Sequence, residues 1–161
     1  LKAIGDVLQF LDQREEALNR YQEALEYYRQ IGDRLGEANI LQEFGKLESN
    51  PQRSLEYLQK AHALYIQIND IYSQSRNLLF IAEAQLNLGE KDAAISSLTQ
   101  ASELAARINF QPFQEYAENK IAAIQNPLFN LWSFARRFFQ QPWVIYGLLF
   151  LVGLIVVLLL R

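Results

Sequence analysis

The stretch that decides the fold is residues 81–101, IAEAQLNLGEKDAAISSLTQA. Small residues stand at Ala82, Ala94 and Ala101, and a large one stands at Leu98. Two antiparallel helices need small residues where they cross and large ones to fill the groove between them. The Asn87–Gly89 segment between the two parts has turn chemistry. The stretch therefore predicts a helix–turn–helix hairpin.

The same pattern occurs twice more towards the N-terminus. Residues 4–24, IGDVLQFLDQREEALNRYQEA, repeat it with Gly5 and Ala17 twelve positions apart, the spacing of Ala82 and Ala94. Residues 44–61, FGKLESNPQRSLEYLQKA, carry a copy that is three residues shorter before its second helix. The copies otherwise recur at an interval of 40 residues. An interval of this length is typical of stacked repeat architectures.

Apolar residues along residues 1–125 recur at spacings of three and four, and strand-like alternation is absent. We therefore predict an all-α fold with helices at residues 1–11, 14–31, 35–48, 52–69, 72–88, 91–108 and 112–125. The last helix either covers the final apolar face of the stack or is the first helix of a fourth repeat.

The spacing of small and large residues resembles that of the tetratricopeptide repeat (TPR). Residues 31–39, IGDRLGEAN, are similar to the linker of its longer, 40-residue variant, which is common in cyanobacteria. The resemblance covers about residues 1–110 and implies an antiparallel helix-hairpin solenoid of about three repeats plus a capping helix in residues 1–126. A generic antiparallel helical bundle is the alternative.

Members of this family hold peptides or partner helices in a groove lined by the first helix of each repeat. Carried over by position, the resemblance implies a partner-binding groove formed by Lys2, Asp6, Gln9, Asn39, Gln42, Lys46, Arg76, Leu79, Glu83 and Leu86. The acidic outer surface is the alternative contact face.

Composition excludes several classes of function. Residues 1–127 hold all 18 acidic residues and a net charge of −6, which argues against nucleic-acid binding. The chain has no cysteine and one histidine, His62, which we interpret as a packing residue. No phosphate-binding loop, catalytic motif or metal-ligand spacing occurs. We expect neither enzymatic activity nor a cofactor.

The C-terminal residues have a different character. Residues 143–160 contain no charge, and 14 of these 18 residues are Leu, Ile, Val or Phe. As a helix they would be about 27 Å long, so we predict a single transmembrane helix at residues 143–161. Trp143 and Tyr146 at one end and Arg161 at the other suit the two interfaces.

Residues 127–142 are amphipathic, and we predict a juxtamembrane helix in the headgroup layer. A helix packed on the repeats is the alternative. The interfacial side chains of this segment are Trp132, Arg136, Arg137, Phe138 and Phe139. The arginine pair places the repeats on the cytoplasmic side of a plasma or thylakoid-type membrane.

These features lead us to expect a single-pass, membrane-anchored scaffold for protein–protein interaction that contacts lipid and protein partners. By resemblance, it would be an assembly or accessory factor, or a subunit, of a membrane protein complex, photosynthetic ones included. Because the chain starts at Leu1 and has no methionine, we expect residues to precede it. The alternative function is therefore a C-terminal docking or sensor region of a larger regulatory enzyme.

Overall fold

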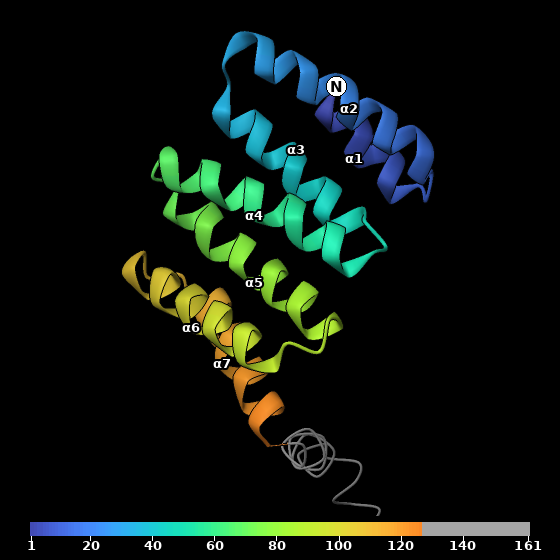
Figure 1. Ribbon diagram of the computed structural model, residues 1–161. Helices are drawn as coiled ribbons and strands as arrows, with labels where there is room; N and C mark the ends of the chain where they lie inside the picture. Colours follow the sequence, from blue (N-terminus) through green and yellow to red (C-terminus); the bar gives the residue numbers. More distant parts are fainter. Residues whose placement is uncertain (127–161) are drawn as a thin grey trace, which may run out of the picture. The chain divides into compact units, whose positions relative to one another are not determined.

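The computed structural model describes residues 1–126, which form seven helices and no strand (Figure 1). The predicted helix boundaries are confirmed to within two residues. The chain divides into two units, Leu1–Ile121 and Ala122–Arg161, and residues 122–126 of the second complete the last helix. The helices are α1 (Lys2–Phe10), α2 (Arg14–Ile31), α3 (Arg34–Leu47), α4 (Pro51–Gln67), α5 (Ile71–Asn87), α6 (Lys91–Arg107) and α7 (Gln111–Gln125).

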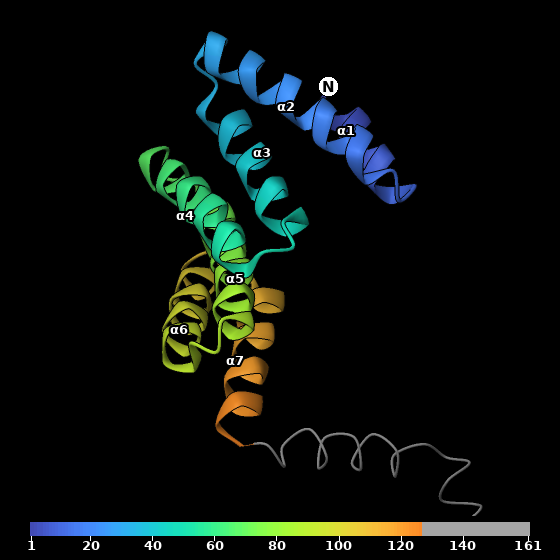
Figure 2. The ribbon, with the colours of Figure 1, turned by 45° about the vertical axis from the view of Figure 1, so that its right-hand side comes forward.

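Within residues 1–121 the helices stack in chain order. Helices α1 and α2, α3 and α4, and α5 and α6 form three hairpins, and α2 packs on α3 as α4 packs on α5 (Figure 2). Each helix thus contacts its neighbours in sequence, as in a repeat protein. The described residues are therefore an all-α, repeat-like helical solenoid, an arrangement compatible with the TPR fold.

The small residues of the sequence pattern lie where helices cross. A Cβ atom added to Gly5 would lie 2.5 Å from the Tyr21 ring, and one added to Gly45 would lie 2.6 Å from Leu58 Cγ. Only the absence of a side chain lets these helices approach so closely. The second-helix positions of all three copies are buried: Ala17, Tyr21, Ala24, Ser54, Leu58, Ala61, Ala94, Leu98 and Ala101.

The turns between helices share one device, with one exception. In the part of the chain that the structure describes, five of the six turns contain a residue with a positive φ angle: Asp12, Gly32, Asn69, Gly89 and Asn109. The α3–α4 turn has none, and it is the turn where the middle copy is three residues shorter. There the Asn50 side chain accepts hydrogen bonds from the Gln52 and Arg53 amides and starts α4.

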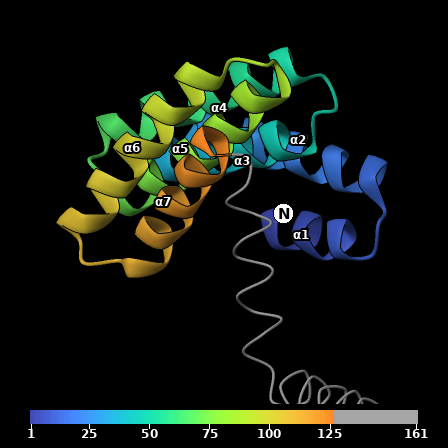
Figure 3. The same ribbon diagram turned by 90° about the horizontal axis from the view of Figure 1, so that it is seen from below.

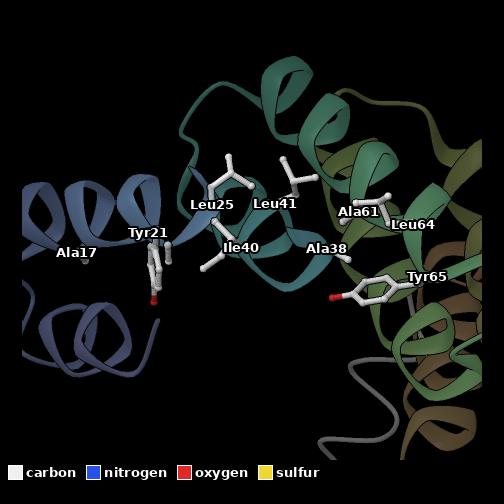
Figure 4. Packing of buried hydrophobic residues seen from close by; sticks show 10 residues of the cluster. Ala17, Tyr21, Leu25, Ala38, Ile40, Leu41, Ala61, Leu64 and Tyr65 are labelled. Carbon is white, nitrogen blue, oxygen red and sulfur yellow. The ribbon is translucent and has the colours of Figure 1, made fainter. Parts of the chain in front are cut away.

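The first two hairpins share a core that runs between them. Figure 4 shows Leu25, Ile40 and Leu41 gathered between α2 and α3, with Tyr21 pointing from α2 towards α1. Tyr21 and Tyr65 are fully buried, yet each carries a hydroxyl group that needs a partner. Those partners lie on the first helix of each hairpin.

The predicted juxtamembrane and transmembrane segments, residues 127–142 and 143–161, lie outside the described residues. Within residues 1–126, none of the helices combines the length and the apolar character needed to cross a bilayer.

Candidate functional site

Side chains of α3, α5 and α7 contact one another directly, and we call the surface of these helices together with α1 the first-helix face. It comprises the polar side chains of α1, α3, α5 and α7 that make the contacts below, together with the ring of Phe80. Lys46 of α3 places its Nζ atom 5.6 Å from the centre of the Phe80 ring on α5. Glu83 of α5 accepts a hydrogen bond from the Tyr116 hydroxyl of α7 at 2.6 Å. Side chains thus connect α3, α5 and α7 without the second helices between them.

At the α1 end, the buried Tyr21 of α2 is tied to this face. Its hydroxyl donates to Asp6 Oδ1 at 2.8 Å and lies 2.9 Å from Gln9 Oε1. Burial raises the pKa of Asp6, but hydrogen bonds from Lys2 and Tyr21 outweigh it, so the net shift is downward. Burial and the bond to Asp6 together raise the pKa of Tyr21 well above its usual value. The cluster therefore contains a carboxylate and a neutral phenol at neutral pH.

On α3 the charges are also paired. Lys46 donates to Glu43 Oε2 at 2.6 Å, and Glu43 itself is buried. Asn39, also on α3, accepts a hydrogen bond from the hydroxyl of Tyr65 on α4 at 2.9 Å. Burial raises the pKa of Tyr65 to about 12, although the nearby Arg76 opposes the shift. Each buried tyrosine thus fixes a polar residue of the face in place.

At the α7 end, Glu83 has two partners. Besides the Tyr116 hydroxyl, Lys120 Nζ lies 3.6 Å from Glu83 Oε1. Burial, followed by the hydrogen bond to Glu83, raises the pKa of Tyr116 well above its usual range. Lys2 with Asp6, Lys46 with Glu43 and Lys120 with Glu83 therefore form three charge pairs along the face.

The structure distributes the ten predicted groove residues over three degrees of exposure. Asp6 and Lys46 are exposed, whereas Gln42 and Leu79 are buried and would not touch a ligand at the surface. The remaining six are half-buried: Lys2, Gln9, Asn39, Arg76, Glu83 and Leu86.

Sequence reasoning missed four contributors to the face, Glu43, Phe80, Tyr116 and Lys120. Tyr116 and Lys120 are four residues apart and so share one side of α7. The spacing of Tyr116 and Lys120 could be recognised in the sequence, but the docking of these two side chains on Glu83 could not.

Other parts of the described surface offer hollows rather than a reactive centre. One hollow of about 560 Å³ lies between α1 and α2, and another of about 340 Å³ lies where α2 and α4 flank the end of α3. His62 is half-buried, its Nδ1 atom has no hydrogen-bond partner, and burial lowers its pKa. Within residues 1–126, no three acidic or histidine side chains gather as a metal site.

No protein-family model and no curated protein sequence matches the chain. The fold rests on the described structure, which is a helical repeat solenoid.

Proposed function

We propose that this protein is a TPR-like interaction scaffold whose first-helix face binds a protein partner and whose C-terminal residues hold it at a membrane. The observation that carries the first half is the continuity of that face. Side chains connect α3, α5 and α7 through Lys46 with Phe80 and Glu83 with Tyr116, and buried tyrosines fix its polar groups. A rigid extended surface of this kind suits a segment of another protein.

The membrane half of the proposal is supported by the composition of residues 143–160. A stretch of this length with no charge favours insertion into lipid by several kcal/mol, at about −0.3 to −0.6 kcal/mol for each large aliphatic residue. Attachment to a membrane raises the effective concentration of a scaffold near a membrane-bound partner. A weak contact between the first-helix face and the partner is then sufficient for binding. We propose a membrane protein complex as the partner and assembly or accessory work as the role.

The experiment for the binding half is affinity capture of the full chain in mild detergent. Lys46→Glu reverses an exposed charge on the first-helix face, whereas Lys60→Glu makes the same change on an exposed residue of α4. The expected result is that Lys46→Glu loses the captured complex and Lys60→Glu keeps it. Equal recovery with both variants would contradict binding through this face.

The membrane half is tested separately, by washing membranes with alkaline carbonate. The full chain is expected to stay in the pellet, and a version ending at Asn126 is expected in the supernatant. Release of the full chain by the wash would overturn the anchoring role without touching the binding proposal.

A further inference from the structure

Helix α3 is shorter than its counterparts in the other two copies. Helix α1 ends at Phe10, five residues beyond Gly5, whereas α3 ends at Leu47, two residues beyond Gly45. Helix α5 repeats the longer version and ends at the fifth residue after Ala82. Three residues are close to one turn of helix. The first helix of the middle copy therefore lacks its last turn.

The smaller of the two hollows lies at this shortened end. Its volume is about 340 Å³, which is at the lower end of the roughly 300–1,000 Å³ that ligand pockets occupy. Leu18 of α2, Phe44 and Leu47 of α3 and Tyr57 of α4 line it, and each is half-buried. The rings of Phe44 and Tyr57 lie 5.6 Å apart, centre to centre, with their planes tilted by 40°. The hollow thus offers an apolar, partly aromatic lining.

Two arginines border the same hollow. Helices α2 and α4 both begin at one edge of the stack, after the α1–α2 and α3–α4 turns (Figure 3). Arg14 is the first residue of α2 and Arg53 is the third of α4, so both side chains come to the hollow.

The charges at the hollow do not cancel. Among the described residues that line it, only Glu48 is acidic, and its Oε2 atom lies 3.5 Å from Arg53 Nε. A hydrogen bond from the Asn50 amide, followed by the charges of Arg53 and Arg14, holds the pKa of Glu48 below its usual value. Two guanidinium groups and one carboxylate leave the hollow with a net charge of +1. This charge contrasts with the net charge of −6 on residues 1–127.

Arg14 is the cation that has no carboxylate partner. Its Nη2 atom donates to the Leu47 carbonyl and, at 3.0 Å, to Ser49 Oγ, and these bonds hold the guanidinium group beside the end of α3. Its other N–H groups have no acceptor within residues 1–126, and no carboxylate of those residues lies within ion-pair distance. A guanidinium group with unoccupied donors forms short, strong hydrogen bonds with a carboxylate.

We propose that this hollow binds an acidic–aromatic segment of a protein partner, with a carboxylate on Arg14 and a neighbouring phenyl side chain against Phe44 and Tyr57. Aromatic rings pack favourably on other rings in offset or edge-on contacts. The site goes beyond the proposed function, because none of the residues named on the first-helix face lines it. A partner segment can therefore bind here while that face is occupied.

The net charge selects a carboxylate among the anionic groups of proteins. One carboxylate balances a charge of +1, whereas a phosphate group carries about −1.5 to −2 and would be repelled by Glu48. The exposed residues Asn19 and Gln22 line the hollow, so it is open to solvent and a chain can continue past it. We therefore assign the carboxylate to an aspartate or glutamate side chain within the segment.

The test is a titration of the full chain in mild detergent with the peptide acetyl-Asp-Phe-amide. The transverse relaxation of the phenyl protons of the peptide, measured by NMR, reports binding. A Kd on the order of 1 mM is expected for so small a ligand in an open hollow. Acetyl-Asn-Phe-amide removes only the charge and acetyl-Asp-Ala-amide removes only the ring. Each is expected to bind roughly tenfold more weakly.

Two variants of α2 locate the site. Arg14→Gln is expected to weaken binding of the Asp-Phe peptide roughly tenfold and to abolish its advantage over the Asn-Phe peptide. Arg20→Gln is the matched control, because it makes the same change on the same helix at a residue that does not line this hollow and pairs with Glu23. Circular dichroism checks that both variants keep their helices. If Arg14→Gln does not fold, Arg53→Gln replaces it, and the comparison of peptides on the wild-type chain needs no variant.

The proposal is overturned if the Asp-Phe peptide shows no saturable binding up to about 10 mM, ten times the expected Kd. It is equally overturned if the Asn-Phe peptide binds as well, or if Arg14→Gln and Arg20→Gln have the same effect. Stronger binding of N-acetylphenylalanine, whose one carboxylate is terminal, would overturn the assignment to an internal acidic side chain. These outcomes are independent of the capture experiment, because the peptides bind without the membrane complex.

Discussion

Gly45 sits where α3 crosses α4, and replacing it with alanine tests whether close helix approach holds the stack together. The added Cβ would lie 2.6 Å from Leu58 Cγ and 3.1 Å from the backbone oxygen of Ser54. The Ser54 hydroxyl also donates to the Gly45 carbonyl at 2.6 Å, which ties the two helices at this point. Neither neighbour can move freely, because Leu58 is fully buried and the Ser54 oxygen belongs to the backbone.

Two opposing terms decide the sign of the effect. Alanine is the better helix former and gains about 0.5–1 kcal/mol over glycine in a helix interior. Overpacking a filled core costs about 1–3 kcal/mol. The steric cost prevails at a contact this short, so Gly45→Ala is expected to lower the free energy of unfolding by about 1–2 kcal/mol.

Equilibrium urea unfolding followed by circular dichroism measures this loss. A double-mutant cycle with Leu58→Ala isolates its cause, because removal of the leucine side chain makes room for the new Cβ. In that background, Gly45→Ala is expected to be neutral or stabilising, with a coupling energy of about 1–3 kcal/mol. If Gly45→Ala stabilises the wild-type chain, or destabilises both backgrounds equally, the steric explanation is wrong.

Three further predictions concern single side chains. The pKa of Tyr65 is raised to about 12, so its contribution to stability is complete below about pH 10 and is lost as the pH rises to 12. Tyr65→Phe should therefore reduce the alkaline loss by up to about 2 kcal/mol in unfolding measured from pH 9 to 12, and an unchanged slope would contradict this. Burial lowers the pKa of His62, so its contribution is present above about pH 6.5 and is lost as the pH falls. His62→Leu should flatten the acid limb of the same titration, and a steeper limb would refute the assignment. Asn50→Ala removes the cap of α4 and should cost about 1 kcal/mol in urea unfolding, whereas no loss would mean that Pro51 alone starts the helix.

The helices and their crossings were predictable because both depend on local spacing. Gly5, Gly45 and Ala82 could be identified in advance, since a helix crossing leaves no room for a larger side chain. The positive φ angle at Asn69 could not be predicted by looking for glycine in the turns, although asparagine is among the residues that tolerate this conformation. The shortening of the middle copy before Pro51 could also be recognised in the sequence. The structure shows that this shorter turn contains no residue with a positive φ angle.

The composition of the first-helix face was less predictable, because it depends on the rotation and docking of whole helices. By resemblance Gln42 and Leu79 belong to the groove, yet Gln42 on α3 and Leu79 on α5 are buried. Tyr116 and Lys120 lie on the helix that we expected to act as a cap, and only its docking brings them to Glu83. The contact between Glu83 and Tyr116 joins residues 33 positions apart in the sequence. It follows from tertiary packing and not from the periodicity of a single helix.

The pairing of charges on this face limits the kind of partner it can select. Lys2, Lys46 and Lys120 each face a carboxylate of the chain itself, so these three pairs contribute little net field. A strongly acidic or basic segment would have to break these pairs, and it would gain little from long-range attraction. A partner with apolar side chains and hydrogen-bonding groups can instead use Phe80 and the fixed polar atoms without disturbing any pair. Such contacts are individually weak, and for that reason the proposed attachment to a membrane matters to the proposed function: it supplies through proximity the affinity that this face does not supply through charge.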